Sequence, residues 1–407
     1  MSARGRASRA ALAALAVVGL VLGAGARPAA AQLGRMGDVE QLAPGVTAPK
    51  ILLITIGRGA LIFEKFGHTA LCLDYAEVDR ATVCFNYGTT DFSAPPMTLT
   101  WNFIRGVQKF YVEPVPLGGM VRFYQREDRT LEQQDLPLTE AQARAVEAEL
   151  LDDLKPENRF YVYDHFADNC TTKLRDILDH ATGGALREGT DRELSTTFRE
   201  MGIQGMAEFP AMIAFGDFGV GRALDRRPTV WEAMFHPFWL RDVVEAKLGA
   251  APRTLYQRRA PPIPDSGSTG RGWALLIGLA FAVPLLVARL TGRHERLATA
   301  IAAAPVALIG LVIWSAAIVS QIPGLRWNEA VFLYTPFDLA LPILDERTRR
   351  RYAQIRLAMV VGVSLLRAVG VFRQPLWVPI VIAFVIFGLC ALERLPRWHR
   401  SAPAPAA

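Results

Sequence analysis

The stretch DNCTTKLRD, residues 168–176, places one cysteine between short polar residues where a helix is expected to begin. Asp168 or Asn169 can act as the N-cap, because the side-chain oxygen of such a residue accepts hydrogen bonds from first-turn amides. Cys170 then lies in the first turn, where unpaired N–H groups and the helix dipole favour the thiolate. The stretch therefore predicts a helix that presents a nucleophile. The alternative is a buried thiol that only packs.

The other cysteines leave Cys170 without an obvious partner. The chain has four cysteines, at positions 72, 84, 170 and 390. The last lies in an apolar segment and is most simply a small core residue. The first two fall in strand-like runs, 67–75 and 81–88, which face each other if the runs pair around residue 78. Two alternatives then remain for Cys72 and Cys84, a disulfide or two buried thiols. In both cases Cys170 is the cysteine without a partner.

A cysteine nucleophile also needs a base. Four histidines lie between the N-terminal segment and the apolar C-terminal part, at positions 68, 165, 180 and 236. His180 is near the far end of the expected helix, whereas His165 remains possible and His68 begins a strand. Pairing Cys72 with Cys84 would put Asn86 diagonally beside His68. We therefore predict Cys170, His68 and Asn86 as nucleophile, base and orienting group.

The N-terminus has the pattern of an export signal. Residues 1–31 combine three early arginines, the apolar run AALAALAVVGLVLGAGA and small residues at Ala29 and Ala31. This pattern predicts a secretory signal peptide that is cut after Ala31, with a retained anchor as the alternative.

The C-terminal third has the pattern of a membrane domain. Five apolar stretches are each close to the length that a helix needs to cross the hydrocarbon layer. They are residues 272–289, 298–320, 327–344, 354–372 and 376–392. The segments 290–297, 345–353 and the tail after 392 are rich in arginine, whereas 321–326 and 373–375 have one arginine each. This asymmetry predicts five spans with the preceding domain outside the cytoplasm.

Residues 32–249 read as one α+β domain, followed by a Pro/Gly/Ser-rich linker at 250–271 and the membrane domain at 272–400. A capping box at Thr139 and Gln142 begins a helix at 140–154. The expected strands are 50–57, 67–75, 81–88 and 107–116.

The charge balance argues against a nucleic-acid partner. Residues 272–407 have 14 arginines and six acidic residues, whereas residues 32–271 have 27 basic and 33 acidic residues. The basic excess therefore belongs to membrane topology, and the exported domain is mildly acidic.

Four stretches resemble one known family. FGHTALCL, FNYGTTDF, PENRFYVYDHFADNCTTKLRDIL and NEAVFLYTPFDLALPIL are similar to the Lnb family of bacterial membrane proteins. The resemblance implies a periplasmic, circularly permuted papain-like (NlpC-type) domain, in which the histidine precedes the cysteine. It also implies a multi-pass protein of the inner membrane that N-acylates lipoproteins without a cofactor or metal. The acyl donor would be a phospholipid and the acceptor a diacylglyceryl-cysteine lipoprotein. His68 and Cys170 match the family's base and nucleophile.

Other possibilities remain open at this point. A related Cys–His domain could cleave peptide or amide bonds in peptidoglycan or envelope proteins, and a membrane scaffold would need no chemistry. Three charged residues, Glu329, Asp338 and Arg367, fall in or near the third and fourth apolar stretches. We expect them to pair, to snorkel or, for Arg367, to bind a phosphate headgroup.

Overall fold

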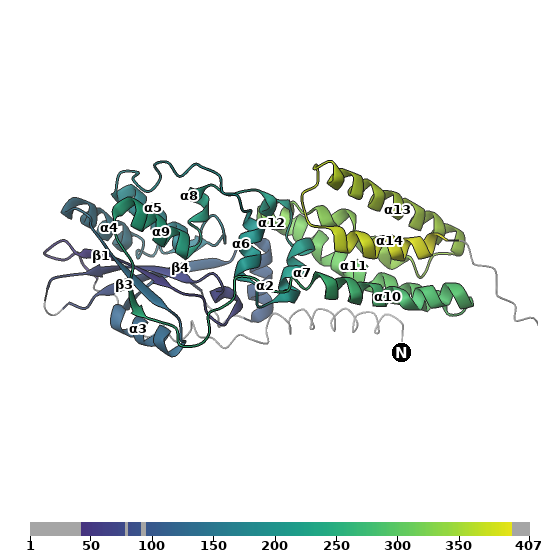
Figure 1. The fold of residues 1–407 in the computed structure, drawn as a ribbon, viewed down its shortest axis with the longest axis horizontal. Helices are drawn as coiled ribbons and strands as arrows, with labels where there is room; N and C mark the ends of the chain where they lie inside the picture. The colour runs from purple at the N-terminus through teal and green to yellow at the C-terminus, as the bar shows by residue number, and fades with distance from the viewer. Residues whose placement is uncertain (1–41, 78–79, 91–94, 393–407) are drawn as a thin grey trace, which may run out of the picture. The chain divides into compact units, whose positions relative to one another are not determined.

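The computed structural model describes residues 42–77, 80–90 and 95–392. The expected signal peptide at 1–31 and the arginine-containing tail after 392 lie outside these residues. The chain folds as two compact units, which are coloured by residue number in Figure 1. The first unit comprises Met1–Thr197 and Arg227–Ile263, and the second comprises Phe198–Arg226 and Pro264–Ala407.

The first unit is built on one antiparallel sheet whose strand order is β6-β4-β3-β2-β1-β5-β7. Helices α4, α5 and α9 pack on β1, β2 or β3, and α3 contacts β4. This mixture of helices and one sheet confirms the predicted α+β class. The elements are β1 (Lys50–Ile56), η3 (Ile62–Glu64), β2 (His68–Asp74), β3 (Val83–Thr89), α2 (Pro96–Arg105), β4 (Lys109–Pro116), α3 (Leu117–Arg126), β5 (Leu131–Leu136), α4 (Glu140–Asp152), β6 (Phe160–Val162), α5 (Cys170–Ala181), α8 (Val230–Ala233), α9 (Pro237–Leu248) and β7 (Arg253–Tyr256).

The core of this unit lies on both faces of the sheet (Figure 1). Alternate residues of β1, among them Leu52 and Ile54, pack with Met120 and Phe123 of α3. The helices α4, α5 and α9 cover the opposite face. Because side chains alternate along a strand, a central strand covered on both faces is apolar at almost every position, as KILLITI is.

The expected hairpin forms in the expected register. In β2 and β3, Cys72 is opposite Cys84, and the two cysteines form a disulfide. The ladder runs from the Leu73–Val83 pair to the Leu71–Phe85 pair. His68 therefore lies beyond this ladder, at the end of the hairpin away from the turn. The disulfide fixes the register of the two strands that lead there.

Two domain boundaries differ from those expected. The segment 250–271 is not a linker throughout, because β7 pairs with β5 at the edge of the sheet. The hydroxyl of Tyr256 also donates to Asp128, at 2.8 Å. The second difference is that Phe198–Arg226 belongs to the second unit, although the sequence places it inside 32–249. Composition does not reveal either assignment, because both depend on long-range contacts.

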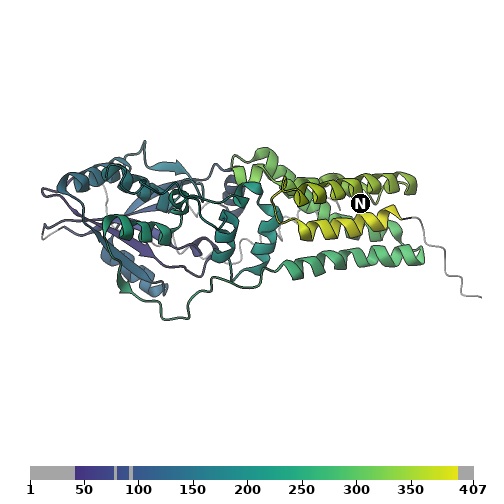
Figure 2. The same cartoon turned by 45° about the horizontal axis from the view of Figure 1, so that its top comes forward.

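The second unit contains four long helices, which run side by side in both Figure 1 and Figure 2. Its elements are α6 (Phe198–Gly205), α7 (Pro210–Gly219), η4 (Arg222–Asp225), α10 (Arg271–Thr291), α11 (Glu295–Val319), α12 (Pro323–Arg326), η5 (Glu329–Phe332), η6 (Pro336–Ala340), α13 (Glu346–Ala368) and α14 (Trp377–Ala391). Among the described residues, α10 and α11 are long and apolar enough to cross a membrane, and α14 is apolar but shorter.

The prediction of five membrane-spanning helices is not confirmed. The third expected span, 327–344, is wrong as a helix, because it contains only the short turns η5 and η6. The side chains of Asn328 and Thr335 cap these turns by accepting from the amides of Ala330 and Phe337. Short polar side chains that bond to the nearby backbone compete with a helix, and a proline at the start of η6 lacks the amide that would continue one.

A buried ion pair supports this irregular segment. Asp338 and Arg356 are 0 % and 2 % exposed and are joined at 3.0 Å, and Tyr352 donates to Asp338 at 2.8 Å. Arg356 also donates to the carbonyls of Phe332 and Leu333, at 2.9 and 2.6 Å. Backbone carbonyls without helical partners are costly in an apolar environment, so α13 supplies the donors that the missing helix would have provided.

Helix α11 supports the same segment from the other side. The indole N–H of Trp314 donates to the carbonyls of Val331 and Tyr334, at 3.1 and 3.0 Å. Gly310 allows the close approach, because a Cβ placed there would lie 2.6 Å from the backbone nitrogen of Thr335. The backbone at 335 therefore packs directly on the helix.

Contacts between loops lie at both ends of the bundle. At one end, Arg349 contacts Glu295 at 3.2 Å and joins the segments 345–353 and 290–297. At the other end, the amide of Gln374 donates to Glu329 at 2.9 Å. The irregular segment thus connects opposite ends of the bundle.

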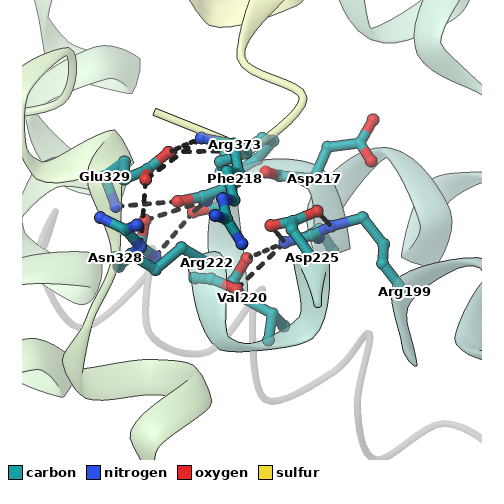
Figure 3. A network of polar contacts seen from close by, with 12 residues as sticks. Arg199, Asp217, Phe218, Val220, Arg222, Asp225, Asn328, Glu329 and Arg373 are labelled. Atoms are coloured by element: carbon teal, nitrogen blue, oxygen red, sulfur yellow. Dashed lines mark hydrogen bonds and ion pairs between the residues drawn. The ribbon is translucent and has the colours of Figure 1, made fainter. Parts of the chain in front are cut away.

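Figure 3 shows how α7 and η4 are held within the second unit. The Asn328 amide donates to the carbonyl of Phe218 at 2.8 Å, and Gln374 donates to that of Asp217 at 3.0 Å. Glu329 accepts from the amides at 373 and 374 and lies 3.6 Å from the guanidinium of Arg222. Arg199 of α6 pairs with Asp225 of η4 at 2.6 Å.

These contacts show what Glu329, Asp338 and Arg367 bind. Asp338 pairs with Arg356, and Glu329 binds backbone amides and Arg222. Arg367 donates to the carbonyls of Arg373 and Gln374. The described residues therefore do not show the expected pairing of Arg367 with Glu329 or Asp338.

Replacing Gly310 with alanine should destabilise the second unit by about 1–3 kcal/mol, because the new methyl group would force the backbone at Thr335 away from α11. The control is Gly362→Ala in α13, where a Cβ meets nothing within 4 Å. That change removes a flexible glycine from a helix and should be neutral or stabilise by about 0.5–1 kcal/mol. Thermal unfolding of the purified protein in detergent measures both, and equal effects would contradict the packing described here.

Candidate functional site

The start of α5 is fixed by Asn169. Its side-chain oxygen accepts from the amides of Thr171 and Thr172, at 2.8 and 2.9 Å, so Asn169 rather than Asp168 is the N-cap. Its side-chain nitrogen donates to the carbonyls of His165 and Phe235, at 2.8 and 2.9 Å. Cys170 is the first helical residue, as predicted, and its amide is a first-turn donor that Asn169 does not engage.

The structure brings Cys170, His68 and Asn86 together. His68 is the first residue of β2, and its imidazole is close enough to the Cys170 thiol to lower the pKa of that thiol. Nε2 of His68 lies 3.2 Å from Oδ1 of Asn86. Asn86 is 5 % exposed, and its amide nitrogen donates to the carbonyl of Cys84 at 3.4 Å.

This arrangement selects one tautomer of His68. The Asn86 oxygen can only accept, so Nε2 carries the hydrogen. Nδ1 then remains as the ring nitrogen that serves the thiol. An imidazole held in this orientation by a side-chain carbonyl can accept a proton from sulfur without first rotating.

Opposing effects set the acidity of the thiol. Burial raises the pKa of Cys170, but the charge of His68 and its hydrogen bond lower it, and the net result is a lowered pKa. The Thr171 hydroxyl, 3.7 Å from the sulfur, and the backbone amide of Thr69 lower the pKa further. All of these groups favour the thiolate, which is the nucleophilic form.

The other histidines are engaged elsewhere. His165 packs against Phe66 with ring centroids 4.6 Å apart, Tyr163 lies 3.2 Å from its Nδ1, and burial lowers its pKa to about 4. Nδ1 of His236 accepts from the Phe238 amide and caps α9. His180 is 73 % exposed at the far end of α5. Of the four candidates, only His68 is positioned at the sulfur.

Tyr161 of β6 is a residue near the sulfur that the sequence did not single out. Its hydroxyl is buried and has no hydrogen-bond partner of standard geometry among the described residues, although the backbone of Gly88 lies close enough to lower its pKa slightly against the larger effect of burial. A Cβ added to Gly88 would lie 3.6 Å from the Cβ of Cys170 and 3.9 Å from the Tyr161 hydroxyl oxygen. Gly88 has φ +96°, so glycine permits this close approach.

The Tyr161 hydroxyl keeps its proton. Burial, followed by the proximity of Cys170, raises the pKa of Tyr161. A protonated hydroxyl without a bonded acceptor can donate to an oxygen that forms near the sulfur. The sequence shows only that Tyr161 lies in an aromatic stretch before Cys170, and this cannot reveal the surroundings of its hydroxyl.

The described residues contain no group of three or more His, Cys, Asp or Glu side chains placed to hold a metal ion. An acidic thiol, an oriented imidazole and nearby N–H and O–H donors are the groups that acyl transfer through a thioester needs. A catalytic role for Cys170, His68 and Asn86 stays a prediction.

Alkylation by iodoacetamide at varied pH should detect a Cys170 thiolate at a lower pH than an ordinary thiol, because the pKa is lowered. His68→Gln should move the midpoint of this pH profile upward, since the imidazole is the largest of the groups that lower the pKa. The other free cysteine, Cys390, is buried, so Cys390→Ser should leave the profile unchanged. An unchanged midpoint in His68→Gln would show that the imidazole does not control the thiol.

The family comparison addresses this unit. No curated protein and no solved structure matches the chain significantly. A periplasmic family domain together with the two apolar helices indicates a membrane protein with a periplasmic domain. Residues 46–201 match the family model described as the Lnb N-terminal periplasmic domain. This range includes Cys170, His68 and Asn86. The match confirms the resemblance to the Lnb family.

Proposed function

We propose that this protein is a membrane acyltransferase. It moves an acyl chain from a phospholipid to the N-terminal amine of a diacylglyceryl-cysteine lipoprotein, through a thioester on Cys170. The observation that carries the proposal is the lowered pKa of a thiol at a helix start, beside an imidazole bonded to Asn86. The match to an Lnb periplasmic domain covers these residues, and the resemblance to that family is what suggests a lipid-related rather than a cell-wall reaction.

In the first half-reaction, the Cys170 sulfur attacks the carbonyl carbon of a phospholipid ester. His68 holds the thiol proton as an imidazolium. Collapse of the tetrahedral intermediate breaks the bond between the carbonyl carbon and the glycerol oxygen. The imidazolium gives its proton to that oxygen, so a lysophospholipid leaves and the acyl chain remains on sulfur.

In the second half-reaction, the α-amine of the lipoprotein attacks the thioester carbonyl. Neutral His68 accepts the proton of the amine, and the amide forms as the thiolate leaves. Thiolate is a good leaving group, so an amine nucleophile suits a thioester. Asn86 keeps the ring in one orientation through both steps, as the 3.2 Å contact with Nε2 indicates.

The tetrahedral intermediates place negative charge on the former carbonyl oxygen. Two donors near the sulfur suit this charge, the first-turn amide of Cys170 and the hydroxyl of Tyr161. Donors that are already oriented before the reaction stabilise such an oxyanion without reorganisation. Tyr161 is thus assigned an oxyanion-binding role.

The membrane supplies both substrates of this reaction. We place the catalytic domain on the periplasmic side of the bacterial inner membrane, with the second unit as a multi-pass membrane domain. The arginine asymmetry of the loops and the exposed apolar side chains of α10, α11, α13 and α14 support this placement. A phospholipid and a lipid-anchored acceptor are both concentrated there.

Mass spectrometry of lipoprotein N-termini tests the reaction in cells that have no other N-acylating enzyme. Cells that produce this protein should have N-acylated lipoproteins, and Cys170→Ala should abolish the added chain because no thioester forms. His68→Gln should reduce it strongly. The matched control is His180→Gln. His180 is exposed at the far end of α5 from Cys170, where it lies 3.6 Å from Glu149.

A labelled acyl chain distinguishes this reaction from peptide or amide cleavage. A phospholipid with a labelled chain should transfer label to the wild-type protein and not to Cys170→Ala, and hydroxylamine should release it. Free lipoprotein amines in cells that contain the folded wild-type protein would refute the proposal. Cleavage of peptidoglycan peptides without acyl labelling would favour a cysteine peptidase instead.

Tyr161→Phe should lower the rate of acyl transfer by about ten- to a hundredfold, because one donor to the oxyanion is removed. The protein should remain folded, since among the described residues the hydroxyl has no hydrogen-bond partner of standard geometry to lose. Tyr163→Phe is the control, because that hydroxyl already contacts His165. Rates from single-turnover acyl transfer measure both, and equal rates for Tyr161→Phe and wild type would remove Tyr161 from the site.

A further inference from the structure

A cavity lies in the second unit and is lined by none of the residues around Cys170. Its volume is about 600 Å³, and it sits where the loop between α10 and α11 meets the start of α13. The lining residues are Gly292, His294, Glu295, Arg296, Leu297, Leu344, Asp345, Glu346 and Arg349. The mechanism proposed above does not use any of them.

One buried guanidinium group lines this cavity with an unused donor, and a second is joined to it through a shared carboxylate. Arg349 lines it, is 3 % exposed, and its Nε has no hydrogen-bond partner within the described part of the chain. Arg289 does not line the cavity but shares Glu295 with Arg349, at 4.0 Å. It is 6 % exposed, its Nη2 donates to the Cys390 carbonyl at 3.0 Å, and its Nε and Nη1 have no hydrogen-bond partner among the described residues. Buried donors without acceptors are costly, so a missing acceptor is expected.

The acidic residues at the cavity do not fill this need. Glu295 is shared by the two arginines, at 3.2 Å from Arg349 and 4.0 Å from Arg289, so two positive charges face one negative charge. Asp345 accepts from the Thr348 amide at 3.1 Å and caps α13. Glu346 is exposed at the rim. The buried part of the site therefore retains a net positive charge.

Two helices also direct their N-termini at the cavity. The first turn of α11 contributes Glu295 and Arg296, and the first turn of α13 contributes Glu346 and Arg349. Both helices are long, at 25 and 23 residues, and the positive ends of their dipoles favour an anion.

We propose that this cavity binds a phosphate group, with Arg349 as its principal donor. Guanidinium groups and helix N-termini are the two features that proteins most often combine around phosphate oxygens. The group can come from a phospholipid headgroup or from free phosphate. The neighbouring Leu297 is 62 % exposed and lines the cavity, so it offers an apolar flank to a lipid.

The test uses the full-length protein, purified in an uncharged detergent and in buffer without phosphate. Inorganic phosphate and short-chain dihexanoyl-phosphatidylglycerol are titrated separately by calorimetry. At least one probe should bind saturably. A lipid site should bind the short-chain lipid at least tenfold more tightly than phosphate, whereas a site for free phosphate should show the reverse order.

Variants locate the binding. Arg349→Gln should weaken it by at least tenfold, and Arg296→Gln at the rim by a few-fold. Arg293→Gln is the matched control, because Arg293 is exposed in the same loop but does not line the cavity. In a Cys170→Ala background, where no acyl chain can be transferred, Arg349→Gln should cause the same loss of binding, because this site does not depend on the acyl-transfer chemistry.

Three results would overturn the inference. The first is the lack of saturable binding of either probe to the folded wild-type protein. The second is wild-type affinity in a folded Arg349→Gln variant. The third result applies if Arg349→Gln does not fold. In that case, equal affinities of Arg296→Gln and Arg293→Gln would show that the rim arginine, Arg296, contributes nothing to binding.

Discussion

The candidate site depends on the way Asn169 holds the first turn of α5. Its side-chain oxygen caps the helix, and its side-chain nitrogen donates to the carbonyls of His165 and Phe235. The cap is therefore anchored to segments that are far apart in the sequence. Cys170 follows directly and cannot move without this cap. Its sulfur is thereby held at the start of β2, where His68 lies.

A second constraint governs the other unit, where the segment 327–344 connects opposite ends of a helical bundle without being a helix. Its carbonyls still need donors, and Trp314 and Arg356 provide them from the two flanking helices. Asp338 keeps the charge of Arg356 balanced. Hydropathy cannot distinguish this arrangement from a helical span, because both place apolar side chains at similar density.

Much of the hairpin around His68 followed from the sequence, since two cysteines twelve residues apart define a register when they face each other. That register placed Asn86 near His68, and the structure has this contact at 3.2 Å. Tyr161 was missed because its significance lies in an unpaired hydroxyl, which is a property of its neighbours. Arg289 and Arg349 were missed for the same reason, since a basic residue next to a membrane segment is ordinary in sequence.

The sequence by itself determined the local features of this protein: the capped helix that begins at Cys170, the strands beside it, the long apolar helices and the odd cysteine. These features depend on neighbouring residues and on the periodicity of side chains. Only the tertiary structure decided which donors surround the sulfur, where the unit boundaries fall and how the 327–344 segment satisfies its backbone. Each of these depends on side chains that are distant in sequence, and their positions are set by packing.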